Sequence, residues 1–368
     1  MDRNFRSLVK KFAFKGEFID AAPYGFGHIN DTYALIFQLE TQTQQRYILQ
    51  RINHNVFKDP VGVMHNLELI THHLQGKIKS QGGDPQRETI NLIPTNDGTS
   101  YYQDEDGEYW RAEVFIEDAQ TYQIPKEPAH YYNASSAFGR FSNLLADFPV
   151  NELAVTIPDF HHTPKRFENF IKALENDPKN RSQHMKPEIQ FLLNREAETS
   201  VLVHLSETGQ IPFRVTHNDT KFENVMIDDR TGQGICVIDL DTVMPGWIDF
   251  DFGDAVRSGS NPAAEDEVNL DKVYFDLEIF DHLAHGFLDT AGDMLTPIEV
   301  QNLAFAARLI TLEQALRFLT DHLMGDVYYR IHRPGHNLDR CRTQIKLIQD
   351  MEAVFDQMEK IVNIYWQR

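Results

Sequence analysis

Two polar loop segments, each joined to a short apolar run, constrain the fold of this chain more than any other feature. The first, VTHNDTKFENVMI, contains Asp219 and Asn224 five positions apart. The second, CVIDLD, ends an apolar run in Asp239, with Asp241 two positions further on. Short apolar runs bounded by turn residues are typical of buried strands. Asp and Asn are also common turn residues, but this joint spacing favours a shared site.

These residue types in this spacing suit phosphoryl transfer. One carboxylate must orient the attacking hydroxyl and accept its proton, and further hard oxygen ligands must hold Mg²⁺ against the phosphates. The kinase catalytic loop has His and Asp followed five positions later by Asn, and then an Asp at a strand end that binds metal. His217, Asp219 and Asn224 match the loop, and Asp239 matches the strand end. If the pleat continues, Asp239 and Asp241 lie on the same side of the strand.

Length and composition limit the classes of protein that remain. A chain of 368 residues exceeds the size of one hydrophobic core, so two lobes are expected. The formal net charge of -20 argues against a nucleic-acid or anionic-membrane partner. Two cysteines supply no disulfide framework, and no stretch reaches the roughly 18 apolar residues of a membrane helix. We therefore expect a cytoplasmic protein, and no protein partner can be inferred.

The order of apolar patterns predicts an α+β fold. TYALIFQL and RYILQRIN form a hairpin pattern, and residues 60–79 have helical spacing behind Pro60. Helical patterns dominate after the polar stretch that follows Ile116, at about 129–147, 164–207 and from 269 onward. We predict a β-rich N-terminal nucleotide-binding lobe at 1–116, a hinge at 117–123, and a larger helical lobe for catalysis and substrate binding at 124–368.

The chain resembles the aminoglycoside phosphotransferase-like small-molecule kinases, and within them most closely the N-acetylhexosamine 1-kinases. The segments that carry this resemblance are YGFGHINDTY, YILQRIN, WRAEVFIEDAQTYQ, VTHNDTKFENVM, CVIDLDTVMPG, FDFGDAVRSG, TLEQALRFLTDHL and HRPGHNLDRCRTQ. The resemblance implies a protein-kinase-like two-lobed fold. It also implies transfer from ATP, with Mg²⁺, to the C1 hydroxyl of N-acetylglucosamine or N-acetylgalactosamine.

The resemblance also implies roles for the residues of the two motifs. Asp219 looks like the general base. Asn224 and Asp239 look like Mg²⁺ ligands, and Asp241 looks like an additional metal ligand or a carboxylate behind it. Lys221, two residues after the base, is placed to reach the phosphoryl group or the sugar.

The nucleotide is expected to contact the N-terminal lobe. Glycines in the YGFGHIND turn can present backbone N–H groups to phosphates. The third strand lacks the lysine that protein kinases keep there and offers Arg51, with Glu68 of the following helix as its natural partner. Residues 113–117 resemble the adenine-binding hinge. The predicted ATP-binding residues are Gly25, Gly27, Arg51, Glu68, Phe115 and Glu117.

The acceptor is expected to contact the same glycine turn and the C-terminal helices. The resemblance implies a substrate contact for Arg317 on the pattern TLEQALRFLTDHL and for Tyr328 beyond it. The predicted substrate-binding residues are His28, Asn30, Lys221, Arg317 and Tyr328. None of the 16 histidines falls in an HExxH pattern, so no zinc site is predicted.

Two alternatives stay open from the sequence alone. The acceptor could be another small alcohol, namely choline, homoserine, an aminoglycoside or a different sugar, since the acidic composition would suit a cation. The chain could also be a non-catalytic nucleotide-binding module with a kinase-like fold. That second alternative predicts a lost base or metal ligand, whereas Asp219, Asn224 and Asp239 are all present.

Overall fold

The chain folds into two compact units, each assembled from separate segments. The structure is a computed structural model that describes residues 5–25, 29–125 and 127–367. Unit 1 comprises Met1–Gln120, Asp147–Pro158 and Met226–Pro245. Unit 2 comprises Thr121–Ala146, Asp159–Val225 and Gly246–Arg368. The lobe boundaries inferred from the sequence at residues 116 and 123 stay a prediction.

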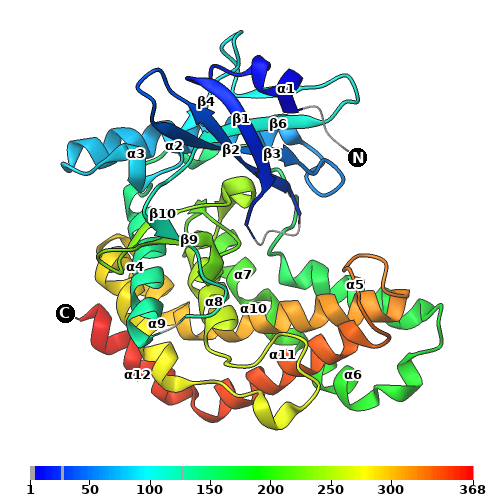
Figure 1. Ribbon diagram of the computed structural model, residues 1–368. Coiled ribbons are helices and arrows are strands. Elements are labelled where there is room, and N and C mark those ends of the chain that lie inside the picture. The colour runs from blue at the N-terminus through cyan, green and yellow to red at the C-terminus, as the bar shows by residue number, and fades with distance from the viewer. Residues whose placement is uncertain (1–4, 26–28, 126, 368) are drawn as a thin grey trace. The chain divides into compact units, whose positions relative to one another are not determined.

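Unit 1 is built on an antiparallel sheet whose strand order is β1-β2-β3-β6-β4, with β5 paired to β6 (Figure 1). β2 and β3 are the predicted hairpin and pair from Asp31↔Arg51 to Gln38↔Gln44. The strands are β1 (Glu17–Pro23), β2 (Asp31–Gln38), β3 (Gln44–Ile52), β4 (Leu92–Ile93), β5 (Tyr101–Gln103) and β6 (Tyr109–Val114).

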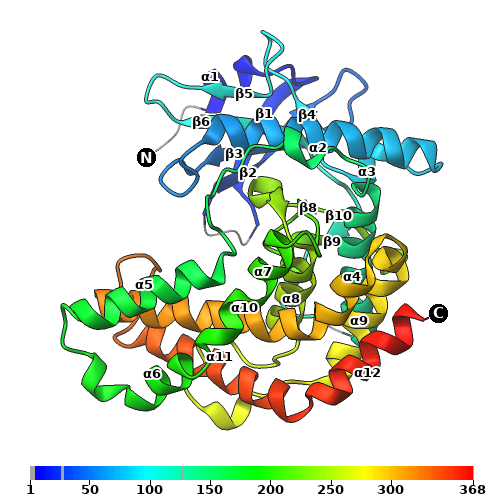
Figure 2. The same cartoon turned by 180° about the vertical axis from the view of Figure 1, so that it is seen from behind.

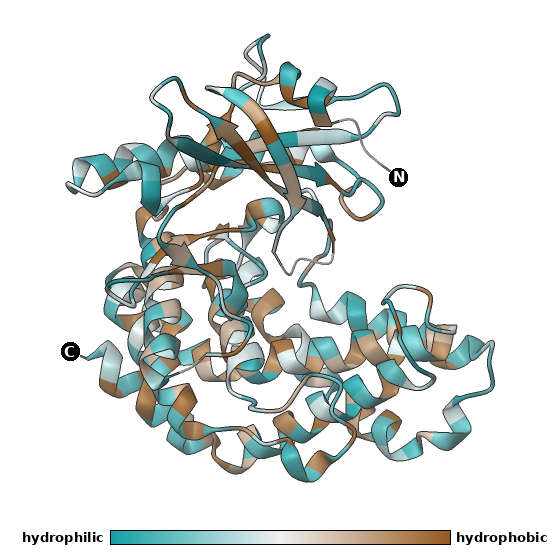
Figure 3. Cartoon of the chain, viewed as in Figure 1, coloured by the Kyte–Doolittle hydropathy of each residue, from teal (hydrophilic) through white to brown (hydrophobic). Residues whose placement is uncertain are grey.

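The two faces of this sheet have different coverings. One face carries an apolar cluster that includes Leu35, Leu49 and Trp110, packed against the short helices α1 (Phe5–Leu8) and η1 (Val9–Lys11). Figure 3 shows these strands rich in apolar residues. The helix α2 (Pro60–Ser80) lies across the other side, as the view from behind shows (Figure 2). Its first turn is capped by Asp59, whose side chain accepts a hydrogen bond from the Gly62 N–H at 2.9 Å.

The remaining elements of unit 1 include the strand and the short helix on either side of Asp239. The strands β7 (Ala119–Gln120), β9 (Val225–Asp228) and β10 (Gly234–Val237) form a small sheet in the order β10-β9-β7. The short helix η6 (Leu240–Thr242) follows β10 directly. The other elements are α3 (Pro85–Glu88), η2 (Val150–Glu152) and β11 (Met244–Gly246).

Unit 2 is mainly helical and is organised around the helix α10 (Pro297–Met324). A capping box fixes its start, because Thr296 and Glu299 each accept a backbone N–H of the other. The other helices are α4 (Pro128–Leu144), α5 (Thr163–Asn176), α6 (Lys186–Leu193), α7 (Val201–Glu207), α8 (Ile248–Gly259), α9 (Leu277–Ala291), α11 (His336–Ala353) and α12 (Phe355–Trp366). The short elements are η3 (Ser182–His184), η4 (Glu196–Ser200), β8 (Arg214–Thr216), η5 (Phe222–Asn224), η7 (Leu270–Lys272) and η8 (Gly292–Met294). Among the described residues, no helix combines the length and the apolar composition needed to cross a membrane.

The predicted helix at 60–79 is confirmed as α2, but the pattern at 164–207 is interrupted. α5 ends where Asp177 adopts a φ of 28°, and Asn180 follows with a φ of 52°. Left-handed backbone of this kind stops a helix, and Asn and Asp adopt it more readily than most residues. The hydrophobic period alone therefore predicts too long a helix here.

Two glycines inside helices provide a matched test of packing between α4 and α9. A Cβ at Gly286 of α9 would lie 2.2 Å from the backbone oxygen of Tyr132 in α4, whereas a Cβ at Gly76 of α2 would meet nothing within 4 Å. We expect Gly286→Ala to lower the free energy of unfolding by about 3 kcal/mol, because the helices must separate. Gly76→Ala should raise it by about 1 kcal/mol through helix propensity. Urea denaturation measures both, and equal effects would contradict the close approach.

Candidate active site

The predicted catalytic loop of unit 2 is held by one buried carboxylate. Asp251 of α8 accepts the backbone N–H groups of His217 and Asn218, each at 2.7 Å. The backbone oxygen of Asp251 also accepts a hydrogen bond from the Thr220 hydroxyl at 2.5 Å. Asn218 has a φ of 64°, so the loop turns sharply just before Asp219. The start of α8 therefore fixes the direction in which Asp219 leaves the loop.

The loop brings three of the predicted residues together. Asn224 donates through Nδ2 to the backbone oxygen of Asp219 at 2.8 Å and to its Oδ2 at 3.2 Å. The Lys221 ammonium lies 2.8 Å from Asp219 Oδ1. Each oxygen of the Asp219 carboxylate thus contacts a donor from its own loop.

The charges around Asp219 keep it ionised. Burial on its own would raise the pKa of Asp219, but the Lys221 ammonium, with His217 and Arg257, lowers it below its usual range. The pKa of Lys221 is raised, chiefly by Asp219. A carboxylate that stays ionised at neutral pH can accept a hydrogen bond from an incoming hydroxyl.

Side chains behind the loop make it rigid. The His217 ring is fully buried and packs edge-on against Phe138 and Phe141 of α4. His161 joins the loop to α10, with Nδ1 at 2.9 Å from Glu313 of α10 and Nε2 at 3.3 Å from the backbone oxygen of Asn218. The loop is therefore connected to three helices of unit 2.

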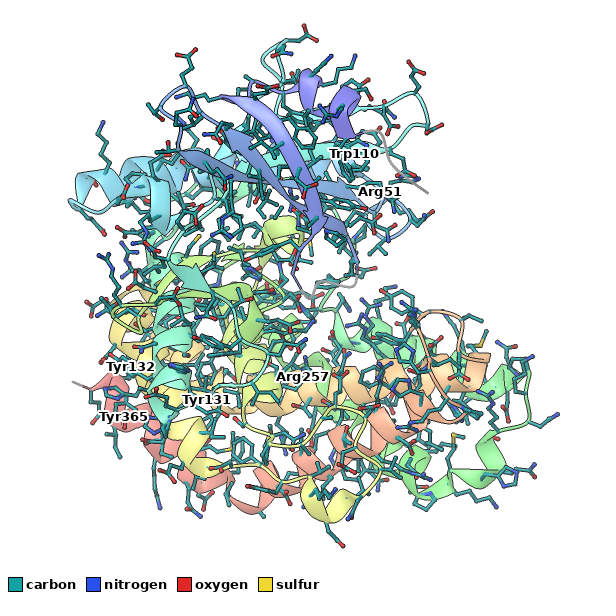
Figure 4. The ribbon with its side chains drawn as sticks, viewed as in Figure 1. Arg51, Trp110, Tyr131, Tyr132, Arg257 and Tyr365 are labelled. Atoms are coloured by element: carbon teal, nitrogen blue, oxygen red, sulfur yellow. The ribbon has the colours of Figure 1, made fainter. Side chains whose placement is uncertain are left out.

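Arg257 is buried within α8 (Figure 4). Its guanidinium donates to Asp254 at 2.8 Å and to Glu265 at 3.1 Å. Burial opposes its positive charge, but Asp254 and Glu265 raise the pKa of Arg257 above its usual value. This cation contributes to the field that keeps Asp219 ionised.

The donors of the predicted Mg²⁺ site have the right chemistry. Because Asn224 uses Nδ2 to bind Asp219, Oδ1 is the atom of its amide that can face a cation. Mg²⁺ prefers such hard oxygen ligands, together with carboxylates such as Asp239. Asp239 belongs to unit 1, so its meeting with Asn224 and Asp219 around one metal stays a prediction.

In unit 1, the segment after β10 is engaged by neighbouring elements. Asp239 adopts a left-handed conformation with a φ of 59°. Asp241 is buried, accepts a hydrogen bond from Asn30 at 2.5 Å and forms an ion pair with Arg111 of β6. The Asn30 side chain also accepts the Asn53 N–H at 2.9 Å. The roles predicted for Asn30 in substrate binding and for Asp241 in metal binding stay predictions.

The expected pair between Arg51 and Glu68 is not formed. Arg51 instead pairs with Asp31 at 2.8 Å and Glu108 at 2.7 Å, while Glu68 is exposed on α2. Arg51 lies beside its register partner Trp110, on the face of the sheet that carries the apolar cluster (Figure 4). The expectation failed because helix pairing was inferred without the strand register.

Two of the predicted glycine-turn residues lie outside the described residues, namely Gly27 and His28. Gly25 is described and has a φ of 83°, a conformation that favours glycine. The roles predicted for all three residues stay predictions.

The predicted hinge residues are ordered by contacts within unit 1. The Phe115 ring is buried against the Tyr24 ring and beneath the Arg46 guanidinium, which lies 3.8 Å from its centroid. The Glu117 carboxylate pairs with the same Arg46. Arg87 donates to the backbone oxygen of Glu117 at 2.9 Å. A role of this segment in binding adenine stays a prediction.

Two predicted substrate residues, Arg317 and Tyr328, line one pocket of about 210 Å³ in unit 2. Arg166 and Thr320 also line it, and within the described part of the chain Arg166 Nε and Thr320 Oγ1 are buried without a hydrogen-bond partner. Burial and the neighbouring Arg317 lower the pKa of Arg166. The complete lining is Arg166, Asn169, Arg317, Thr320, Asp321, Met324, Val327, Tyr328 and Tyr329.

The negative group of this pocket is already satisfied. Asp321 accepts the backbone N–H groups of Val327, Tyr328 and Tyr329 at 2.8–2.9 Å and the Asn337 amide at 2.9 Å. The pocket therefore presents two guanidinium groups, while its carboxylate is occupied by donors from the protein.

Comparison with known proteins identifies the family. Residues 91–284 match the model of the phosphotransferase enzyme family, which is more than half of the chain. The chain belongs to this family. The matched range contains the phosphotransferase motifs of both units, including Asp219, Asn224 and Asp239.

Solved structures show the same fold at low sequence identity. An aminoglycoside phosphotransferase from Alicyclobacillus acidocaldarius has a TM-score of 0.62 at 13% identity, covering 98% of this chain and 96% of that one. An amicoumacin kinase in complex with AMP-PNP, Ca²⁺ and Ami has a TM-score of 0.59 at 15% identity, with coverages of 94% and 93%. The ethanolamine kinase of Plasmodium vivax has a TM-score of 0.53 at 13% identity, with coverages of 88% and 82%. The predicted α+β, kinase-like fold is confirmed.

Four residues with clear structural positions were missed from the sequence. Asp251 stands in the segment FDFGDAVRSG without an assigned role, and the 16 histidines, His161 among them, were considered together only for a zinc site. Arg111 stands in the β6 segment WRAEV, where a charged residue inside a strand pattern was the available signal. Arg166 gave no signal, because one arginine on an amphipathic helix is usual.

The raised pKa of Asp251 predicts a pH-dependent stability. Burial raises this pKa to about 7, although two N–H donors oppose the shift. The folded state therefore binds this proton more tightly than the unfolded state does. Protonation of Asp251 makes its full contribution to the free energy of unfolding below about pH 4, and this contribution is lost as the pH rises to about 7. Asp251→Asn removes this titration. The amount by which its free energy of unfolding falls below that of the natural protein should therefore shrink, as the pH rises through this window, by up to about 1.4 kcal/mol per pH unit.

Urea denaturation at pH 5 and pH 7.5 measures this difference. Asp356→Asn, which changes an exposed carboxylate on α12, is the control. A deficit of Asp251→Asn that is the same at both pH values would contradict the interpretation.

The Lys221 contact predicts the acid limb of the activity profile. In Lys221→Met, burial of Asp219 is no longer opposed by the nearby ammonium, so the acid limb of kcat/KM should move up by about one pH unit. Lys272→Met, an exposed lysine of η7, should leave the profile unchanged. The measurement is kcat/KM for phosphoryl transfer between pH 4 and 8, and an unmoved limb in Lys221→Met would refute the assigned interaction.

Proposed function

We propose that this chain is an ATP- and Mg²⁺-dependent kinase that phosphorylates the anomeric hydroxyl of an N-acetylhexosamine, N-acetylglucosamine or N-acetylgalactosamine, to the sugar 1-phosphate. The observation that carries the proposal is the contact set of Asp219, Lys221 and Asn224 in a chain of the phosphotransferase family. A non-catalytic module would have no reason to keep an ionised carboxylate in this loop.

Each residue of the loop has a defined task in this reaction. The acceptor hydroxyl donates a hydrogen bond to Asp219, its oxygen attacks the γ-phosphorus of ATP, and the bond to the departing ADP oxygen breaks. The proton of the hydroxyl passes to Asp219. Lys221 holds Asp219 ionised until that step. Asn224 and Asp239 would hold Mg²⁺, which supplies positive charge against the phosphate oxygens when bound.

The pocket of Arg166 and Arg317 supports an uncharged or anionic acceptor. Two guanidinium groups offer donors to hydroxyl and carbonyl oxygens and repel an ammonium group. Arg166 Nε and Thr320 Oγ1, which are buried and have no hydrogen-bond partner among the described residues, need one, and an amide or sugar oxygen would supply it. The Tyr328 ring, 69% exposed at the pocket, offers a surface on which a sugar can stack.

The same feature separates the proposal from its main alternative. Aminoglycosides and ethanolamine, which name two of the structural neighbours, are cationic acceptors. A pocket for such acceptors needs available carboxylates, whereas Asp321 is already bound by three backbone N–H groups and an amide. The choice of an N-acetylhexosamine rests further on the segments GHINDTY and TVMPG.

A panel of acceptors tests the proposal. ADP release is measured with ATP, Mg²⁺ and N-acetylglucosamine, N-acetylgalactosamine, glucose, choline, ethanolamine, homoserine or an aminoglycoside. We expect kcat/KM for an N-acetylhexosamine to exceed that for each cationic acceptor by at least about 100-fold, because a buried charge mismatch costs several kcal/mol. Phosphorus and proton NMR of the product should place the phosphate on C1.

Two variants complete the experiment. Asp219→Asn should abolish turnover and excludes a contaminating kinase. Arg317→Met should raise the KM for the acceptor by about tenfold with little change in the KM for ATP, because it removes a pocket donor. Faster turnover of choline or ethanolamine than of both N-acetylhexosamines would overturn the acceptor assignment.

A further inference from the structure

Arg111 is a fully buried cation in the sheet of unit 1. Its side chain is 1% exposed and projects from β6. Nε donates to Gln50 Oε1 at 2.9 Å and lies 2.9 Å from Glu113 Oε1, while Nη1 pairs with Asp241. Burying a guanidinium is costly unless it is paired and hydrogen-bonded, so this site is built around its charge.

The surrounding carboxylates keep Arg111 charged. Burial alone would lower the pKa of Arg111, but Asp241, Glu113 and Asp239 raise it above its usual value. Two of these three carboxylates, Asp239 and Asp241, belong to the second phosphotransferase motif. Arg111 is therefore a buried cation that faces this motif within unit 1.

Arg111 and Arg51 project from opposite faces of the sheet. Arg111 is the register partner of Gln50, and Arg51 is the register partner of Trp110. Because side chains alternate along a strand, Gln50 and Arg111 share one face, whereas Arg51 shares the other with the apolar cluster. Asp241 contacts Arg111 and thus lies on the face opposite Arg51.

Asp241 connects Arg111 to the turn that precedes β2. One oxygen of Asp241 pairs with Arg111, and the other accepts the Asn30 amide at 2.5 Å. Asn30 in turn accepts the Asn53 N–H at 2.9 Å. Both oxygens of Asp241 are thus bound by protein donors, and the carboxylate joins β6 to the Asn30 turn.

The segment between Asp239 and Val243 is held from a second side as well. Asn66 of α2 donates to the Val243 backbone oxygen at 2.9 Å and to the Ala154 oxygen at 2.8 Å. Two residues before the Asp241 anchor, Asp239 keeps a left-handed backbone, which costs a non-glycine residue of order 1 kcal/mol. Such a conformation persists only where its surroundings impose it.

We propose that Arg111 is a positioning residue of the phosphoryl-transfer site: it binds Asp241, and through Asp241 it fixes the orientation of the Asp239 carboxylate and of the Asn30 turn. Asp241 acts in this network as the partner of Arg111 and Asn30, while the proposed function assigns Asp239 to Mg²⁺. This inference rests on the proposed function, because it assigns Asp239 to the metal.

Arg111→Lys tests the inference. It keeps the positive charge but removes the planar guanidinium group that contacts Gln50 and Asp241 at the same time. Calorimetry measures the dissociation constant of ATP in EDTA and in Mg²⁺, and the ratio of the two is the contribution of the metal. We expect this ratio to fall by about tenfold or more and kcat to fall by about 10- to 100-fold.

A purely structural role would lower the Tm and leave the metal ratio unchanged. Arg195→Lys is the matched control, because Arg195 makes a two-point pair with Glu352 in unit 2 at 3.0 and 2.8 Å. If Arg111→Lys does not fold, Asn30→Ala removes the second contact to Asp241 at a partly buried position and should lower the metal ratio about threefold.

The outcomes separate the inference from the proposed function. The inference alone is overturned if Arg111→Lys keeps the wild-type kcat and the wild-type ratio of the ATP dissociation constants in EDTA and in Mg²⁺. If Arg111→Lys does not fold, a wild-type ratio in Asn30→Ala has the same consequence. Absence of Mg²⁺-dependent nucleotide binding in the natural protein overturns the proposed function and the inference together.

Discussion

The candidate site depends on the carboxylate of Asp251 more than on any other group of unit 2. By accepting the N–H groups of His217 and Asn218, it satisfies two buried backbone donors in a loop that forms no regular ladder at that point. The left-handed residue Asn218 and the position of Asp219 follow from that attachment. The chemistry of Asp219 is therefore set by a helix start that does not itself touch the reacting atoms.

In each unit one buried side chain holds the segment that carries predicted site residues. In unit 2 the buried carboxyl group of Asp251 holds the backbone of the loop, and Lys221 then adjusts the ionisation of Asp219. In unit 1 a buried cation, Arg111, holds the side chain of Asp241 beside the left-handed Asp239. In both cases the side chain is buried, and hydrogen bonds or ion pairs with neighbouring protein groups offset the energetic cost of its burial.

Contacts between residues that are close in the sequence could be predicted, whereas contacts between distant residues could not. Asn224 contacts Asp219 because five residues of one loop keep them close, and α2 was predictable because Pro60 and the apolar period are local signals. The partner of Arg51 was not predictable, since a shift of one residue in register moves a side chain to the other face of the sheet. Arg111 and Asp251 gain their meaning only from residues more than thirty positions away, at Asp241 and His217. A single sequence carries no signal for such pairs.

The location of the pocket within unit 2 alone bears on the kinetic order of the reaction. Its nine lining residues, including Arg166 and Arg317, all come from one compact unit, whereas the predicted nucleotide contacts come largely from the other. In the proposed function the acceptor contacts of this pocket are complete before any nucleotide arrives, whereas those predicted for His28 and Asn30 belong to unit 1. Such an arrangement favours random addition of the two substrates over a compulsory sequence in which ATP must bind first.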